Sequence, residues 1–198
     1  MNRRDFWLGL AVGTLSTCLL GPWVFSAASK EADPPKCLSP DIVAEYIHSV
    51  IQADRTFYQI EIVDRMRERG IVFSSEHWRE NGELPIPDKF LQDSGRFVAE
   101  QRKGIRFQLV SSWAINEKNR PTTAFEQTGL AQLLVNPDRP YTGVTTEGGA
   151  RVFQALYADK AVSQHCADCH NVHSKSPKSD FKAGDVMGGI LITIPLPK

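Results

Sequence analysis

The chain has 198 residues, which is enough for one domain of ordinary size plus an N-terminal extension and too few for two full domains. Its 23 Lys and Arg residues balance its 23 Asp and Glu residues, so the formal net charge at pH 7 is zero. Because the chain has neither an overall positive charge nor a basic run, we do not expect it to bind nucleic acid.

The first 28 residues form a segment separate from the fold. Arg3 and Arg4 precede residues 6–28, which contain no charged side chain and predict either an export signal or a membrane-spanning helix. Small residues at 26–28 would suit cleavage, whereas the length of the apolar run favours a retained anchor. The positive N-terminus places the rest of the chain outside the cytoplasm. We expect a periplasmic or otherwise extracytoplasmic protein, anchored in the inner membrane by residues 6–28 if they are not cleaved.

A polar, proline-bearing linker at residues 29–38 precedes the domain, which we assign to residues 39–198. Ser39 as N-cap, Pro40 at the first helical position and Gly70 as terminator predict one long helix, or two helices joined by a kink. Apolar residues recur along it at mostly helical spacing, so one face is expected to pack on a core. The residues of this expected core face are Val43, Ile47, Val50, Phe57 and Val63.

The remainder of the domain mixes helices and strands. A proline-bearing loop precedes a helix at roughly 87–102, a short helix covers 121–137, and strands are predicted at 105–113, 141–149, 150–159 and 188–196. The pair Gly148-Gly149 predicts a hairpin turn. These elements describe an α+β domain with a PAS-like antiparallel sheet in a meander, a long N-terminal helix and flanking helices on one side.

The sequence Cys166-Ala167-Asp168-Cys169-His170 carries the most specific chemical signal. C-x-x-C-H is the attachment signature of c-type haem: two intervening residues match the spacing of the porphyrin vinyl groups, and the adjacent histidine reaches the iron. This covalent attachment takes place outside the cytoplasm, in agreement with the export segment. We therefore expect one covalently attached haem c.

Three other interpretations of the motif stay open. A thioredoxin-like C-x-x-C would need a βαβ context, which the surroundings do not show. A zinc site could combine Cys166 and Cys169 with His165 and His173, although such sites usually draw two ligand pairs from separated loops. A disulfide between the two cysteines is the simplest alternative.

Residues 136–196, including "YTGVTTEGGARVFQALYADKAVSQHCADCHNVH" and "FKAGDVMGG", resemble a family of exported c-type-haem domains with a PAS-like fold. The resemblance extends to "EHWRENGELPIPDKF" and "INEKNRPTTAFE"; His173-Ser174 departs from the family's usual His-Pro. It implies that Cys166 and Cys169 form the thioethers and that His170 is the proximal iron ligand. Domains of this family are often joined to a kinase or another transmitter, which implies a sensory role.

The motif does not fix the sixth iron ligand. We rank His77 first, because it stands in a predicted loop beside Trp78, and this pair could line a flat aromatic cofactor. An open site or an exchangeable water comes next. The other candidate ligands are Cys37, His48, Met66 and Met187. Basic residues that could pair with haem propionates or present a docking surface are Arg55, Lys175, Lys178 and Lys182.

We expect this monohaem protein to act in redox or ligand sensing. Periplasmic electron transfer is the alternative, and a peroxidase-like enzyme ranks last because it needs an open distal site with a general acid–base group. The expected partners are the membrane, through an uncleaved N-terminal segment, and a redox or signalling protein. A homodimer formed through the long helix is compatible with the pattern.

Overall fold

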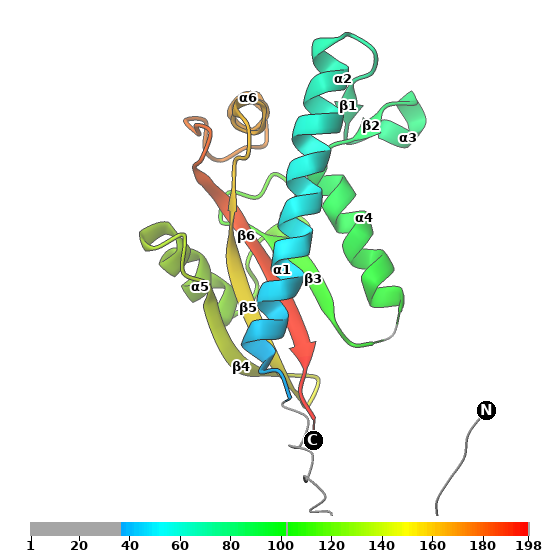
Figure 1. Ribbon diagram of the computed structural model, residues 1–198. Helices are drawn as coiled ribbons and strands as arrows, with labels where there is room; N and C mark the ends of the chain where they lie inside the picture. Colours follow the sequence, from blue (N-terminus) through cyan, green and yellow to red (C-terminus); the bar gives the residue numbers. More distant parts are fainter. Residues whose placement is uncertain (1–36, 102, 198) are drawn as a thin grey trace, which may run out of the picture. The chain divides into compact units, whose positions relative to one another are not determined.

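A four-stranded antiparallel sheet lies at the centre of the domain (Figure 1). The computed structural model describes residues 37–101 and 103–197. The strands are β3 (Arg106–Val110), β4 (Tyr141–Glu147), β5 (Ala150–Lys160) and β6 (Val186–Pro195), and their order across the sheet is β3-β6-β5-β4. The predicted hairpin joins β4 to β5, with positive φ angles at both turn glycines. The predicted meander thus covers β4, β5 and β6, while β3 pairs with the last strand.

The helices, in chain order, are α1 (Pro40–Phe57), the π-helix η1 (Tyr58–Asp64), α2 (Arg65–Glu68), α3 (Trp78–Asn81), α4 (Pro87–Glu100), the 3-10 helix η2 (Glu117–Asn119), α5 (Ala124–Val135) and α6 (Gln164–Val172). None of the helices within the described ranges is long and apolar enough to cross a membrane. The predicted export or anchor segment lies outside the described residues.

Helices cover both faces of the sheet, so the prediction that they lie on one side is wrong. The first face packs against α1 and α4, and the opposite face packs against α5. The reason is visible in β6, where Ile190 and Ile192 face α1 and α4 while Leu191 between them faces α5. All three side chains are buried. A strand with apolar residues at consecutive positions needs cover on both faces, which helices on one side alone would not give.

The predicted long helix is present as a continuous run from α1 through η1 to α2, ending at Gly70 with a φ of 64° (Figure 1). The sequence predicts one long helix or two helices joined by a kink; the structure has one continuous helix with a π-helical stretch at its middle. The prediction that Val50 and Phe57 face the core is wrong, because both side chains are exposed. In the π-helical stretch Gln59 and Val63 are buried. Such π-helical turns are rare and frequently occur at functional sites.

The segment predicted as a loop before α4 has more structure than expected. Two short strands, β1 (Ser74–Ser75) and β2 (Leu84–Pro85), pair in parallel and enclose α3. The Tyr58 hydroxyl donates a hydrogen bond to the carbonyl of Pro85 over 2.6 Å and its ring stacks on Phe90. This segment is therefore fixed against both η1 and α4.

The short helix predicted at 121–137 is present as α5, which begins later than predicted, at Ala124, with a complete capping box. Thr123 accepts a hydrogen bond from the Glu126 amide, and the Glu126 carboxylate accepts one from the Thr123 amide. The Glu126 carboxylate also accepts a hydrogen bond from Gln108 on β3. These bonds satisfy the buried Glu126 side chain and attach the start of α5 to the sheet.

Candidate functional site

The C-x-x-C-H sequence lies on α6, which connects β5 to β6 at one end of the sheet (Figure 1). Ala167 between the two cysteines is completely buried, and it packs with Ala161, Phe181 and Met187. Cys166 also packs against this cluster, whereas Cys169 is exposed.

A cavity of about 1260 Å³ lies beside α6. Its walls come from α6, from η1 and the end of α1, from the start of α4, and from residues 109–120 at the end of β3 and after it. Met187 and Gly188 of β6 also line it. The cavity is larger than the roughly 300–1,000 Å³ typical of small-molecule sites. It therefore has room for a large cofactor directly next to the motif.

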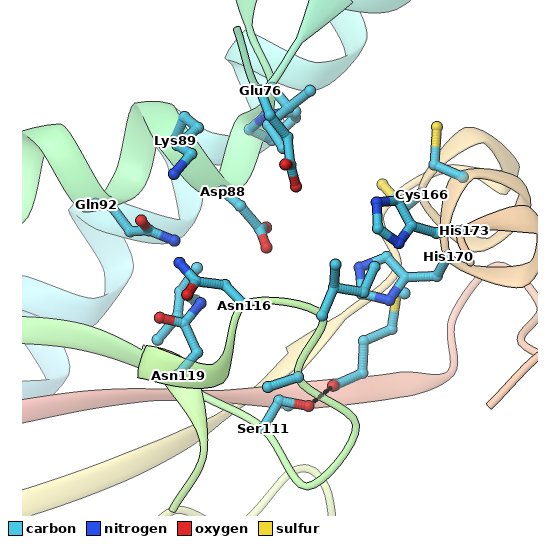
Figure 2. Close-up of a pocket in the computed structure, with 18 of the residues that line it drawn as sticks. Glu76, Asp88, Lys89, Gln92, Ser111, Asn116, Asn119, Cys166, His170 and His173 are labelled. Atoms are coloured by element: carbon cyan, nitrogen blue, oxygen red, sulfur yellow. Dashed lines mark hydrogen bonds between the residues drawn. The ribbon is translucent and has the colours of Figure 1, made fainter. Parts of the chain in front are cut away.

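All three predicted motif residues line this cavity (Figure 2). Cys166 and His170 are four positions apart, which places them on the same face of a helix. Cys166 and Cys169 are both free thiols, so the structure shows no disulfide between them. Among the described residues, no group of three or more His, Cys, Asp and Glu side chains is arranged to hold a metal ion, so the predicted zinc alternative has no support.

The protein environment favours the neutral form of the motif histidine. Desolvation lowers the pKa of His170 below its ordinary value, with Asp88 opposing this shift and His173 and Arg55 adding to it. A neutral imidazole is the form that binds iron. Its Nδ1 atom is buried and has no hydrogen-bond partner. An unpaired buried nitrogen is costly in the protein alone and marks a site that an additional group would complete.

The two cysteines do not stand in a thioredoxin-like context. Desolvation raises the pKa of Cys169 above its ordinary value, and Arg67 opposes this shift. The helix α6 connects β5 to β6, which pair antiparallel, so it is not part of the βαβ unit in which a thioredoxin-like motif stands.

A buried ion pair forms part of the cavity wall. Nη1 of Arg55 on α1 lies 2.8 Å from Oδ1 of Asp159 at the end of β5, and the two side chains are 4% and 9% exposed. Nη1 also donates a hydrogen bond to the Lys160 carbonyl over 3.3 Å. Arg55 and Asp159 both line the cavity. Asp88 at the start of α4 also lines it, and Figure 2 shows its carboxylate between α4 and α6. The cavity therefore contains charge that is shielded from water.

A polar chain links η1 to the helix that carries the motif. Gln59 donates a hydrogen bond to the Asp64 carboxylate over 2.7 Å. The same carboxylate oxygen lies 3.8 Å from Nδ1 of His165, the residue before Cys166. Because Gln59 and Asp64 are five positions apart, the π-helical geometry is what brings them to the same side.

Phe181 and Asn171 hold α6 in place, and the sequence analysis missed both. The Asn171 side chain donates to the Phe181 carbonyl and accepts from the Phe181 amide, both over 2.9 Å. The buried Phe181 ring meets the His170 ring edge to face, with centroids 5.8 Å apart. The only signal in the sequence was the run "FKAGDV", which belonged to the family pattern but had no assigned role.

The first-ranked sixth ligand, His77, does not lie in the cavity. It precedes α3 as an exposed residue, and its carbonyl accepts hydrogen bonds from that helix. Its neighbour Glu76 is among the lining residues and is drawn at the cavity in Figure 2. The structure therefore gives no support to His77 as an iron ligand, because the chain turns into α3 at this position.

The other candidate ligands are also distributed over the domain. Cys37 is exposed at the start of the described chain, and Met66 on α2 is not among the lining residues. His48 stacks on Tyr157, with ring centroids 3.9 Å apart, and lines a different pocket. Met187 does line the cavity and is buried.

The three lysines after the motif have different positions. Lys175 lines the cavity, whereas Lys182 is exposed outside it. Lys178 forms an ion pair with Asp180 and lies over the Phe181 ring. Of the predicted propionate partners, Arg55 and Lys175 are thus the two that reach the cavity.

A comparison with known families identifies the chain at this point. The family model Tll0287-like (Tll0287) matches residues 41–195, which include the long helix, the cavity residues and α6. The chain belongs to the Tll0287-like family. No curated protein matches it. Among solved structures it is similar to the cyanobacterial heme-protein Tll0287, with a TM-score of 0.46 and 16% sequence identity, over 81% of this chain and 99% of that one.

Proposed function

We propose that this member of the Tll0287-like family carries one covalently attached haem c and acts in redox or ligand sensing outside the cytoplasm. Cys166 and Cys169 would hold the haem through thioether bonds, and His170 would bind its iron. The observation that carries the proposal is the placement of these three residues, two of them free thiols, along the wall of one large cavity.

The residues present fit such a group. The Nδ1 atom of His170 is buried and has no hydrogen-bond partner. A cofactor bound at this wall would complete the site. Arg55 and Lys175 line the same cavity and could neutralise haem propionates. Leu109, Val110, Ala114 and Met187 supply apolar surface for the porphyrin.

The attachment chemistry needs no oxidant. Each thiol adds across one porphyrin vinyl group, so that sulfur bonds to one carbon, the hydrogen goes to the other, and nothing is released. The haem supplies reversible one-electron chemistry at its iron. The protein's part is to hold it: the buried Ala167 and the Asn171–Phe181 contacts fix α6, and desolvation keeps the His170 imidazole neutral.

Sensing is supported by the continuity of the long helix. Gln59 and Val63 of η1 line the cavity, and η1 continues without a break into α1, which runs across the sheet. In the sequence, α1 starts shortly after the predicted anchor segment. A change at the cavity wall would thus act directly on the helix that follows the predicted anchor segment in the sequence, which a simple electron carrier would not need.

Covalent attachment is tested by maturing the full chain with a c-type haem assembly system. We expect wild type and Cys37→Ser to keep haem on denaturing gels, and Cys166→Ser/Cys169→Ser to lose it. Cys37→Ser is the matched control, because it removes a thiol outside the motif. Retention of haem by the double variant would refute the proposal.

The role of His77 is tested by optical spectra of the reduced protein with and without carbon monoxide. We expect His77→Ala to give the wild-type spectra, because His77 is exposed outside the cavity. His170→Ala should change the spin state. Binding of carbon monoxide by wild type would favour ligand sensing, and a six-coordinate haem that ignores it would favour redox sensing or electron transfer. Spectra of His77→Ala that differ from those of wild type would instead identify His77 as the sixth ligand.

A further inference from the structure

The long helix exposes an apolar stripe that the domain leaves uncovered. Tyr46, Val50, Phe57 and Ile60 are exposed to 60%, 62%, 61% and 41%. Ala53, between Val50 and Phe57, is also exposed. We call these five residues the outer stripe. Single exposed apolar residues are common, but a continuous row on one helix points to an interaction surface.

The spacing of the outer stripe is that of a coiled-coil seam. Successive members are four, three, four and three positions apart, as at the a and d positions of a heptad repeat. The opposite face of α1 packs against the rest of the domain, since Ala44, Ile51 and Arg55 are buried there. The helix therefore has two packing faces, and the outer one fits another helix.

The charges at the two ends of the helix differ in sign. Residues 40–54 contain no Lys or Arg, and Asp41, Glu45 and Asp54 are exposed there. At the other end Arg65, Arg67 and Arg69 are exposed and outnumber the exposed Glu61 and Glu68. A parallel pair of such helices would place like charges side by side, whereas an antiparallel pair would place opposite charges side by side.

We propose that the outer stripe is the interface of a homodimer in which the long helices of two copies pack antiparallel around a two-fold axis near Ala53. A two-fold interface must be self-complementary, and this stripe meets that condition. The large residues of the outer stripe lie on both sides of the small Ala53. Asp41 and Arg65 lie at equal distances along the chain from Ala53. Each acidic end then faces the partner's basic end.

A segment of the same chain is a poorer occupant. Residues 29–36, which precede α1, read Ser-Lys-Glu-Ala-Asp-Pro-Pro-Lys, with two prolines and one small apolar residue. Such a segment has no apolar row to match five positions on a helix, and proline interrupts helical pairing. A second copy supplies both the row and the charges.

The dimer is tested by analytical ultracentrifugation of the haem-loaded full chain in detergent. We expect wild type to be a dimer and Phe57→Glu to weaken dimerisation by about a hundredfold or more, because each copy would bury a carboxylate in the seam. The matched control is Phe97→Glu on α4, since Phe97 is exposed to a similar extent, 56%, but lies outside the outer stripe. A monomeric wild type, or a Phe57→Glu protein that still dimerises, for instance through residues 6–28, would overturn the proposal.

The antiparallel orientation has its own test. Neutralising the acidic end with Asp41→Asn/Glu45→Gln should weaken the dimer by about tenfold, because attractions with the partner's arginines are lost at both ends. High salt should also weaken the wild-type dimer, because it screens the attraction between the acidic and basic ends. A parallel dimer would instead become tighter in this variant, since repulsion between its acidic ends would be removed, and that result would refute the orientation.

Discussion

Replacement of Arg55 by leucine should reduce the free energy of unfolding by about 3–5 kcal/mol at about pH 8, and by much less at about pH 5. Removal of one partner from a buried ion pair leaves the other charge uncompensated in a low-dielectric environment. The side chains of Arg55 and Asp159 are 4% and 9% exposed, so water cannot replace the lost guanidinium.

The pH dependence follows from the pKa of Asp159. Burial raises it from 3.8 to about 6, Arg55 opposes this shift, and Asp88 adds to it. A carboxyl group with a raised pKa binds its proton more tightly in the folded state than in the unfolded state. Its contribution to stability is therefore largest at low pH and is lost as the pH rises through about 6. Without Arg55 the pKa of Asp159 rises further, so the loss grows towards alkaline pH.

Urea unfolding of wild type and Arg55→Leu at the two pH values measures this effect. The double variant Arg55→Leu/Asp159→Asn is the control, because it removes both charges and should recover most of the lost stability at about pH 8. An equal loss for Arg55→Leu at both pH values would show that packing of the arginine stem, rather than the unpaired carboxylate, causes the destabilisation.

Replacement of Phe181 by alanine is expected to cost about 3–5 kcal/mol, the range for a buried phenylalanine. The ring is 2% exposed and packs with Ala161, Ala167 and Met187 beneath α6. It also meets the rings of Trp113 and His170 edge to face. The variant should therefore loosen the helix that presents the thiols as well as lower global stability.

Two measurements separate these effects. Urea unfolding gives the change in stability, and the fraction of chains with covalent haem after maturation reports on the position of α6. Phe181→Leu, which keeps most of the apolar volume, should lose less stability and retain more haem than Phe181→Ala. If Phe181→Ala is as stable as Phe181→Leu, the ring does not support α6 as described.

Local patterns in the sequence predicted most of the elements of this fold. Pro40 and Gly70 mark the ends of the long helix, and Gly148-Gly149 marks the hairpin. The layer arrangement was not predictable in the same way, because the sequence predicts a strand around Leu191 but not which of its faces are covered. Whether the second face of the sheet is covered depends on where α5 packs, and the apolar residues of α5 show no clear helical periodicity.

The candidate site likewise contains some residues that a local sequence pattern predicts and others that it does not. Cys166, Cys169 and His170 are adjacent in sequence, so their spacing alone predicted a common site. Arg55 on α1 and Asp159 on β5 form the buried ion pair in the cavity wall, and no local pattern could bring two residues so distant in sequence together. His77 as sixth ligand stays a prediction: a short helix follows it, and Glu76 rather than His77 lines the cavity.

The π-helical stretch has a consequence for the angular phase of the long helix. An α-helix advances by about 100° per residue, so one additional residue turns everything after it by about that angle relative to an uninterrupted helix. Asp64, five positions after Gln59, therefore reaches the same side of the helix and lies beside His165, while Ile60 faces outwards. Because η1 belongs to both surfaces, a twist of this helix about its own axis moves the outer stripe and the cavity wall through the same angle.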